Sequence, residues 1–242
     1  MKDVTWQQFK ESVSNKKVAI LPIGSIEQHG LHAALGTDLF IAEGLSRTAE
    51  GHENVMMLPS LPVGVAEYHR HFAGSLWVRP ETLKQYVGEV ITSLAYHGVR
   101  KVIIVNGHGG NREPLKEMAR YVMMEERIHI VVWTWFESIE PEIIRMYGRR
   151  PPLHADEAET AMLMALKPDA VMPEFYEASA QGAGEWGKFY RGTMISQVVR
   201  DFTPTGATGD PTKTDLKLGE RMLELSKQNL HELIDYMSDL QL

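Results

Sequence analysis

The feature that most limits how this chain can fold is the alternation of short apolar runs with segments of helical periodicity. Apolar runs that predict buried strands fall at 17–25, 54–64, 99–106 and 128–136. Apolar residues with helical spacing fall at 3–13, 38–52, 79–98, 111–127, 154–167 and 212–237. Strands and helices that alternate along a chain build an α/β fold, in which a mostly parallel sheet is flanked by helices on both faces.

A chain of 242 residues suits one domain with a substantial core, and no repeat or linker-like segment divides it, so we expect a single domain over 1–242. The segments 65–79 and 176–213 are expected to be mostly loop. Trp133 and Trp135 alternate on the last predicted strand, so both should face one side, toward the core or toward a substrate pocket.

Composition excludes several classes of partner and site. The formal net charge of −7 argues against nucleic acid or an anionic membrane as a partner, because both require clustered Lys and Arg. The absence of cysteine excludes disulfides and thiolate metal sites, so any metal must bind to His, Asp and Glu. The N-terminus lacks the apolar core of a signal peptide, and no apolar run is long enough to span a membrane, so a cytoplasmic protein is expected.

Three metal-binding residue types gather where the first predicted strand ends, in the stretch PIGSIEQHGLHAALGTD (22–38). Glu27 and His29 are two residues apart, so on extended chain their side chains point to the same side. They lie at the carboxyl end of the strand, where ligands collect in open α/β sheets. Asp38 opens the next helix at the same rim. Singly, His29 suits a surface position and Asp38 a helix cap, but together the three indicate a metal site.

A second cluster follows the apolar run of the third predicted strand, in VIIVNGHGGN. His108 lies just past the strand, and glycines remove side-chain bulk around it. A phosphate-binding turn is an alternative, but the Lys and Ser or Thr of a P-loop are missing. We interpret His108 as a metal ligand, with a structural turn as the other possibility.

A third cluster, HADEAETAM, begins the helix predicted over 154–167. Asp156 and Glu157 suit the ordinary role of acidic residues in a first helical turn. Glu159 precedes an apolar stretch and should face inward, where an unpaired carboxylate is costly unless it binds a cation.

The five candidates are three carboxylates and two neutral imidazoles, namely Glu27, His29, Asp38, His108 and Glu159. Two divalent cations with a bridging hydroxide bring this set to zero net charge, so the set suits a dinuclear site with one shared carboxylate. Oxygen and nitrogen ligands of this kind are compatible with Zn, Mn or Fe.

Five stretches together resemble the creatininase (creatinine amidohydrolase) family. They are LPIGSIEQHGLHAALGTD, YHRHFAGS, VNGHGGN, HADEAETA and TGATGDPTKT, which occur in family order and cover residues 20 to about 215. The resemblance implies a creatininase-type, Rossmann-like α/β sandwich, a homo-oligomer that is usually a hexamer, and a metal-dependent hydrolase acting on a small amide or related substrate. It also implies two metal ions held by Glu27, His29, His108 and Glu159, with Asp38 as the bridge.

The chain departs from the creatinine-hydrolysing members at several positions. Gly110 stands where those members carry a glutamate, Ala73 and Ser75 stand where Pro and Thr are usual, and Asp156 and Ala161 replace Gly and Ser. Creatinine is therefore not the expected substrate. The family also includes enzymes that deformylate a formylamino-pyrimidine nucleotide, trim a peptide in cofactor maturation, or open the ring of a keto-inositol of the 3-dehydro-scyllo-inosose type.

The resemblance also suggests a mechanism, in which a metal-activated hydroxide attacks a carbonyl. His154 or Glu157 would carry a proton to the leaving group. His69 and Arg70 would orient the substrate, although a polar loop surface is the simpler interpretation of His69. His32 has no place in the ligand set and is expected beside the ligands or at the surface. A metal-binding oligomeric scaffold without catalysis is the alternative from a different class.

Overall fold

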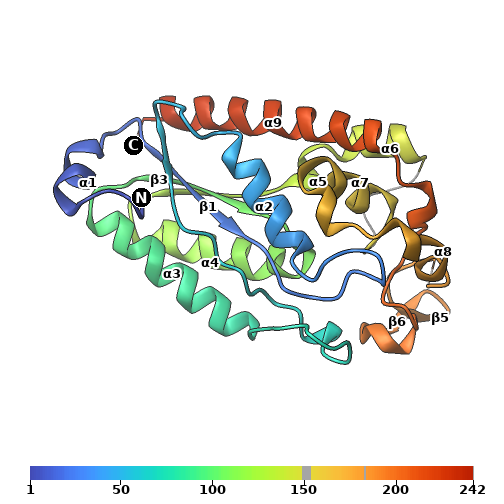
Figure 1. Ribbon diagram of the computed structural model, residues 1–242. Helices are drawn as coiled ribbons and strands as arrows, with labels where there is room; N and C mark the ends of the chain where they lie inside the picture. The colour runs from blue at the N-terminus through green and yellow to red at the C-terminus, as the bar shows by residue number, and fades with distance from the viewer. Residues whose placement is uncertain (149–153, 183, 242) are drawn as a thin grey trace.

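The structure is a computed structural model that describes residues 1–148, 154–182 and 184–241. Four strands form one sheet in the order β2 (Val55–Met57), β1 (Val18–Ile23), β3 (Lys101–Asn106) and β4 (His129–Thr134) (Figure 1). Every neighbouring pair is parallel. All residues of β1 and β3 are buried, as expected for the central strands of a sheet covered on both faces. The predicted α/β fold with a parallel sheet is therefore confirmed.

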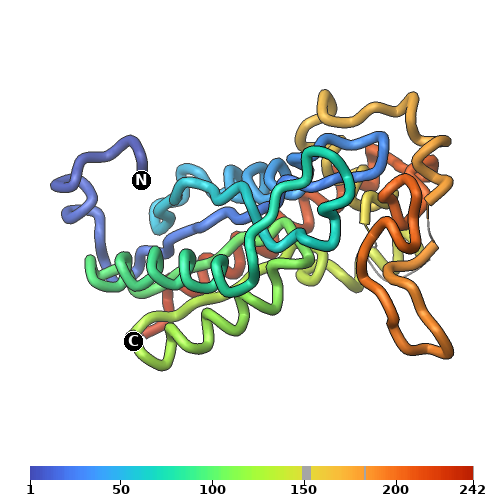
Figure 2. Tube along the Cα trace, turned by 90° about the horizontal axis from the view of Figure 1, so that it is seen from below, coloured from blue at the N-terminus to red at the C-terminus, as the bar shows by residue number. Residues whose placement is uncertain are grey.

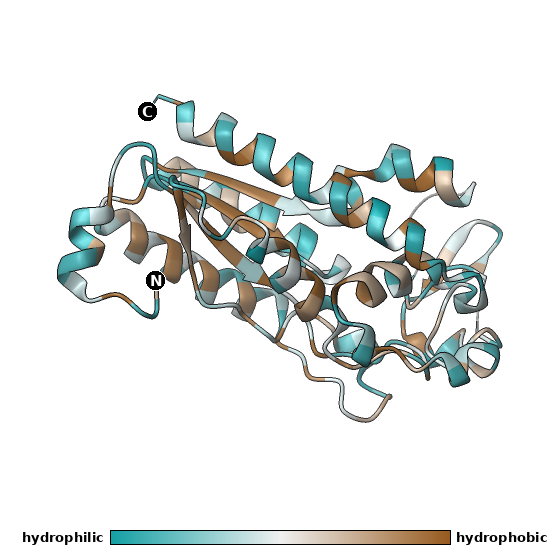
Figure 3. Ribbon diagram, turned by 45° about the horizontal axis from the view of Figure 1, so that its top comes forward, coloured by the Kyte–Doolittle hydropathy of each residue, from teal (hydrophilic) through white to brown (hydrophobic). Residues whose placement is uncertain are grey.

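Helices cover both faces of the sheet. On one face, α3 (Pro80–Tyr96) and α4 (Arg112–Glu125) pack on apolar side chains that include Leu21 and Ile104. On the other face, α2 (Thr37–Arg47), α7 (Glu157–Leu166) and the long α9 (Leu216–Asp239) pack on side chains that include Ile20 and Ile103. Figure 3 shows the apolar strands lying between these two layers. Because both core clusters share one sheet, we retain the proposal of a single domain.

The remaining elements are short. They are α1 (Trp6–Ser12), η1 (Glu67–His69), η2 (Gly109–Asn111), α5 (Trp135–Ser138), α6 (Glu140–Tyr147), η3 (Pro168–Ala170), η4 (Pro173–Phe175), α8 (Tyr176–Ser179), β5 (Lys188–Tyr190), β6 (Thr193–Ser196), η5 (Val199–Asp201) and η6 (Pro211–Lys213). The antiparallel pair β5–β6 lies in a region expected to be mostly loop, and Figure 2 shows it projecting at the end of the molecule opposite the termini. Among the described residues, none of the helices is both long and apolar enough to cross a membrane.

Two predicted strands are shorter than expected. β4 ends at Thr134, which pairs with the last residue of β3, so the sheet offers no partner beyond it and the chain turns into α5 at Trp135. The expectation that Trp133 and Trp135 alternate on one strand is therefore wrong, although both rings lie in the same core cluster. β2 stops at Met57, although Leu58 and Leu61 N–H still donate to the carbonyls of Ile20 and Pro22 in β1.

Candidate metal centre

The site lies where the two central strands end side by side. Ile23, the last residue of β1, is in register with Asn106, the last residue of β3. The chain then leads to Glu27 and His29 on one side and His108 on the other. In parallel sheets ligands bind at this carboxyl edge, so the fold brings the first two sequence clusters together.

Helix α2 adds Asp38 because its first turn sits directly against the strand ends. A side chain at Gly107 would collide with the main-chain carbonyl of Asp38, and one at Gly24 would collide with the backbone of Leu39. Only glycine permits this approach at both exits from the sheet. The two glycines therefore set how close the Asp38 carboxylate comes to the other side chains.

Among the residues that the structure describes, three groups of side chains place their ligand atoms within 4.8 Å of one another, and all their members are buried. One group is Glu27, Asp38 and His108; a second is His29, Asp38 and Glu159; a third is Glu27, His29 and His154. The structure thus brings together all five residues expected as ligands, and it adds His154 to their neighbourhood.

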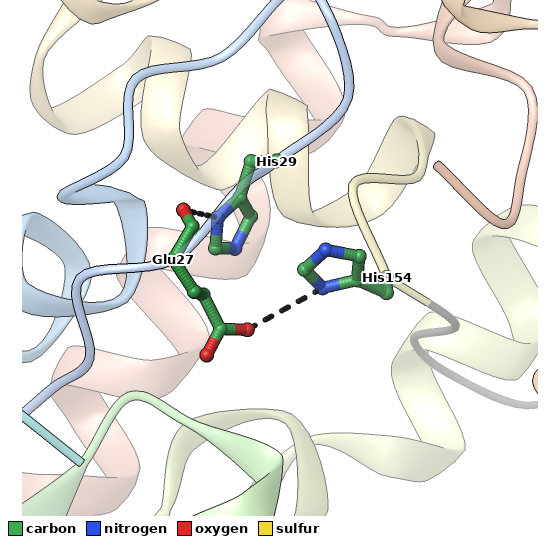
Figure 4. Close-up of side chains that lie close together, drawn as sticks. All are labelled: Glu27, His29 and His154. Atoms are coloured by element: carbon green, nitrogen blue, oxygen red, sulfur yellow. Dashed lines mark hydrogen bonds and ion pairs between the residues drawn. The ribbon is translucent and has the colours of Figure 1, made fainter. Parts of the chain in front are cut away.

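Asp38 belongs to two of these groups through different oxygens. Its Oδ1 lies 3.2 Å from Nε2 of His29, and its Oδ2 lies 3.0 Å from Nδ1 of His108. Main-chain carbonyls fix both rings, since a carbonyl only accepts: His29 Nδ1–H donates to Glu27 (Figure 4) and His108 Nε2–H donates to Val65. His29 Nε2 and His108 Nδ1 therefore face the carboxylate, as in histidine ligands whose other nitrogen is held by a carbonyl.

Several potential metal-ligand atoms of the site are buried and do not form hydrogen bonds with one another. Within the described part of the chain, Glu27 Oε1, Asp38 Oδ2 and His69 Nε2 are buried without a hydrogen bond. Yet Glu27 Oε1 lies only 3.2 Å from His69 Nε2, so the atoms are close but poorly aligned. Buried carboxylate oxygens without partners are costly, and a divalent ion removes that cost. Nitrogen and oxygen donors of this kind suit Zn, Mn or Fe.

Glu159 reaches the site from the first turn of α7. Asp156 caps this helix, and its Oδ1 accepts from the backbone N–H groups of Ala158 and Glu159. Glu159 Oε2 then lies 3.5 Å from His29 Nε2 and accepts from Ala155 N–H at 2.7 Å. Glu157 points elsewhere, because its Oε2 accepts from the backbone N–H of Asp210. Of the two glutamates, only Glu159 falls within a group able to hold an ion.

The charges in the site shift one another's proton affinities. Burial lowers the pKa of His108, but Glu27 and Asp38 outweigh it and raise that pKa to about 9. Burial likewise opposes the charge on His29, while Asp38 and Glu159 raise its pKa well above the usual value. Burial would raise the pKa of Glu27, yet His108 and His69 lower it. When no ion is bound, protons on His29 and His108 therefore supply the positive charge that balances the carboxylates.

Two further histidines border the ligand groups. His154 Nε2 lies 2.7 Å from the main-chain carbonyl oxygen of Gln28 and 2.8 Å from its side-chain amide nitrogen, and Nδ1 faces Glu27 Oε1 at 3.7 Å (Figure 4). Burial, His69 and His29 lower the pKa of His154 well below its usual value. His69 is fully buried, so it does not form part of a loop surface. Its Nδ1 lies 2.8 Å from the amide nitrogen of Gln28.

Sequence reasoning missed Gln28, although it stands between two predicted ligands. Its amide nitrogen, which has two hydrogens to donate, also lies 2.8 Å from His154 Nε2 and 3.1 Å from the Gly206 carbonyl, so Gln28 joins both histidines. Arg70, by contrast, is exposed, and its Nε contacts the neighbouring His71. His32 is buried rather than at the surface: its ring nitrogens contact Thr160 and Ser179, which ties the first cluster to α7 and α8.

A cavity of about 510 Å³ opens onto the ligand groups. Its described lining combines the site residues with the aromatic side chains of Tyr68, Phe136 and Trp186. Pockets of this size and character bind small molecules. A side chain at Gly110 would collide with the Tyr68 hydroxyl and the Val65 carbonyl, so Tyr68 fills the space beside the glycine-rich turn.

A family model described as creatinine amidohydrolase (Creatininase) matches residues 2–234. The chain is 26% identical over 188 residues to the creatinine amidohydrolase of Pseudomonas putida, covering 70% of this chain and 72% of that protein. It is 30% identical over 213 residues to the mycofactocin precursor peptide peptidase of Mycobacterium tuberculosis, covering 84% and 78%. It is 26% identical over 178 residues to the 3-dehydro-scyllo-inosose hydrolase of Thermotoga maritima, covering 71% and 57%.

A crystal structure of creatinine amidohydrolase superposes with a TM-score of 0.83 at 24% identity, covering 100% of this chain and 98% of that one. This similarity shows that the two chains share a fold. The parallel sheet and the buried carboxylate–histidine centre define an α/β protein with a candidate metal site, and the matched family is one of hydrolases. The chain belongs to the creatininase family, and the resemblance stated from its sequence motifs is confirmed.

Proposed function

We propose that this protein is a dinuclear metal-dependent hydrolase whose substrate is a small amide. The observation that supports this most directly is that Asp38 offers one oxygen to His29 and the other to His108, as a shared ligand would. In the proposal, Glu27 and His108 complete the first ion site, and His29 and Glu159 complete the second. When bound, the ions supply Lewis-acid polarisation of a carbonyl and activation of a water molecule.

We assign proton transfer to His154. Its Nε2 is occupied by the main-chain carbonyl and the amide nitrogen of Gln28, so Nδ1 is the ring nitrogen that faces the site and can carry a proton to the leaving group. Its lowered pKa keeps the ring neutral near neutral pH. His69 directs Nε2 toward Glu27 Oε1 in the same space and is assigned to orienting the substrate. Glu157 is directed toward Asp210 and has no part in this proposal.

The first test is metal content. Purified protein loaded with Zn, Mn or Fe should hold about two divalent ions per chain, and chelation should abolish hydrolysis of whichever compound the loaded protein accepts. Cyclic amides, formamides, lactones and keto-inositols form the screen, and the keto-inositols are included because of the similarity to the Thermotoga maritima hydrolase. The proposal would be refuted if the protein bound no divalent ion and its melting temperature did not change when metal was added.

The second test is His154→Gln. We expect kcat to fall by about 10²–10⁴-fold, the range typical of a lost general acid or base. Metal content should remain at the wild-type value, because His154 carries protons in this proposal and does not hold an ion. Loss of an ion in His154→Gln would make His154 a ligand of the Glu27–His29–His154 group instead.

The alternative from a different class is a metal-binding scaffold without catalysis. It predicts bound ions with no turnover across the whole screen, so the same experiment separates the two. The homo-oligomer implied by the family resemblance stays a prediction, and the mass of the protein in solution by light scattering tests it.

A further inference from the structure

An arginine side chain lines the cavity that opens onto the candidate metal centre. Arg112 is the first residue of α4, directly after the glycine-rich turn that carries His108. Among the described residues of the lining it is the single Lys or Arg side chain. No step of the proposed mechanism uses Arg112, so the mechanism does not explain why this side chain lies in the cavity.

The guanidinium of Arg112 has donors beyond the nitrogen that pairs with Glu137. Its guanidinium makes an ion pair with Glu137 through Nη2, and its side chain is 35% exposed. Its Nε–H is buried, and in the described part of the chain it has no hydrogen-bond partner. The guanidinium carbon lies 5.9 Å from the centre of the Phe136 ring, another residue of the lining. A guanidinium has five N–H donors in a fixed fork that matches carboxylate and phosphate oxygens.

Arg112 shares its carboxylate partner Glu137 with a second cation. Glu137 has a second partner, because Lys116 Nζ lies 3.3 Å from its Oε1. Glu137 therefore keeps a cation when Arg112 engages a ligand. Glu113 also lines the cavity, but its side chain is 82% exposed and lies 4.0 Å from Lys116, so water and that lysine screen it.

We propose that Arg112 binds an anionic group of the substrate, a carboxylate or a phosphate, while the substrate carbonyl lies at the metal centre. The inference rests on the proposed function and narrows its substrate class to amides that carry a negative charge away from the reacting bond. Phe136 supports the guanidinium from the side, as aromatic rings support arginine in other sites.

The test uses hydroxamates, which bind metal ions through two oxygens, as probes of the metal-loaded protein. One series ends in a carboxylate, a second in a phosphonate and a third in the neutral carboxamide, each at increasing chain length. Isothermal titration calorimetry measures the affinity of each probe. We expect an anionic probe to bind at least about tenfold more tightly than the carboxamide of equal length, as for a hydrogen bond to a charged group. The anionic series with the larger preference identifies carboxylate or phosphate as the group recognised.

Variants then assign that preference. Arg112→Gln should remove it, and Arg112→Lys should keep only part of it, because lysine lacks the planar fork. Arg120→Gln is the matched control: it makes the same change on the exposed side of α4, and the preference should survive there.

Equal binding of charged and neutral probes by the unaltered protein would overturn the inference and leave the metal site standing. A preference that persists in Arg112→Gln would overturn it as well. If no hydroxamate of any series bound, the metal site and the inference would fall together.

Discussion

Replacing Asp38 with asparagine tests the shared ligand, because the change keeps the shape of the side chain and removes its charge. The two oxygens of Asp38 face His29 at 3.2 Å and His108 at 3.0 Å, so asparagine leaves at most one neutral oxygen for the two ion sites. A zinc site built from four protein ligands binds with roughly 10–16 kcal/mol, or about 3 kcal/mol per ligand. Both ions should therefore bind about a hundredfold more weakly, since every 1.4 kcal/mol is tenfold in affinity.

The assay is metal content by mass spectrometry after dialysis against a buffered low concentration of Zn or Mn, together with titration of the metal-free variant. Asp215→Asn is the control, because it makes the same change at the cap of α9, outside the three ligand groups. Asp38→Asn should lose both ions while the control keeps them. Retention of both ions at wild-type affinity would refute the shared role, and loss of a single ion would place Asp38 in one site only.

Much of this centre could be predicted because its residues follow from where strands end. The apolar runs locate β1 and β3, and the parallel sheet then brings Glu27, His29 and His108 to one edge. Asp38 was predictable from the helix that begins beside it, and the glycines at 24 and 107 explain how closely that helix approaches.

The contacts that could not be predicted join distant loops. Gln28 contacts His154, which is 126 positions away, and Trp186 packs on both His69 and His154 from the segment expected to be loop. The spacing of residue types along the sequence indicates which side chains share a face of one helix or strand, but it does not predict contacts between distant segments. For the same reason the sequence could not choose between a place beside the ligands and the surface for His32, because its partners lie on α7 and α8.

Two remaining predictions concern stability. Lys101 is 1% exposed and its Nζ donates to the Ser238 carbonyl at 2.7 Å near the end of α9, so Lys101→Met should leave that carbonyl unpaired and destabilise the fold by about 2 kcal/mol. Thermal unfolding should show that the melting temperature of Lys101→Met is lowered by roughly 4–8 °C. Lys16→Met, which changes an exposed lysine, is the control and should leave the melting temperature unchanged. Equal melting temperatures of the two variants would contradict a stabilising role for the Lys101 hydrogen bond. The second prediction is that metal-free protein loses stability between pH 6.5 and about 9. The pKa of His108 rises from 6.5 to about 9 on folding, so its contribution is fully present below pH 6.5 and is lost as the pH rises through about 9. That contribution is roughly 3 kcal/mol, and His29, whose pKa is also raised, acts in the same direction. Bound ions need neutral imidazoles and bind more tightly as the pH rises, so the melting temperatures of loaded and metal-free protein should diverge across this range. If the melting temperatures of loaded and metal-free protein changed in parallel with pH, His29 and His108 would not hold protons in place of the metal.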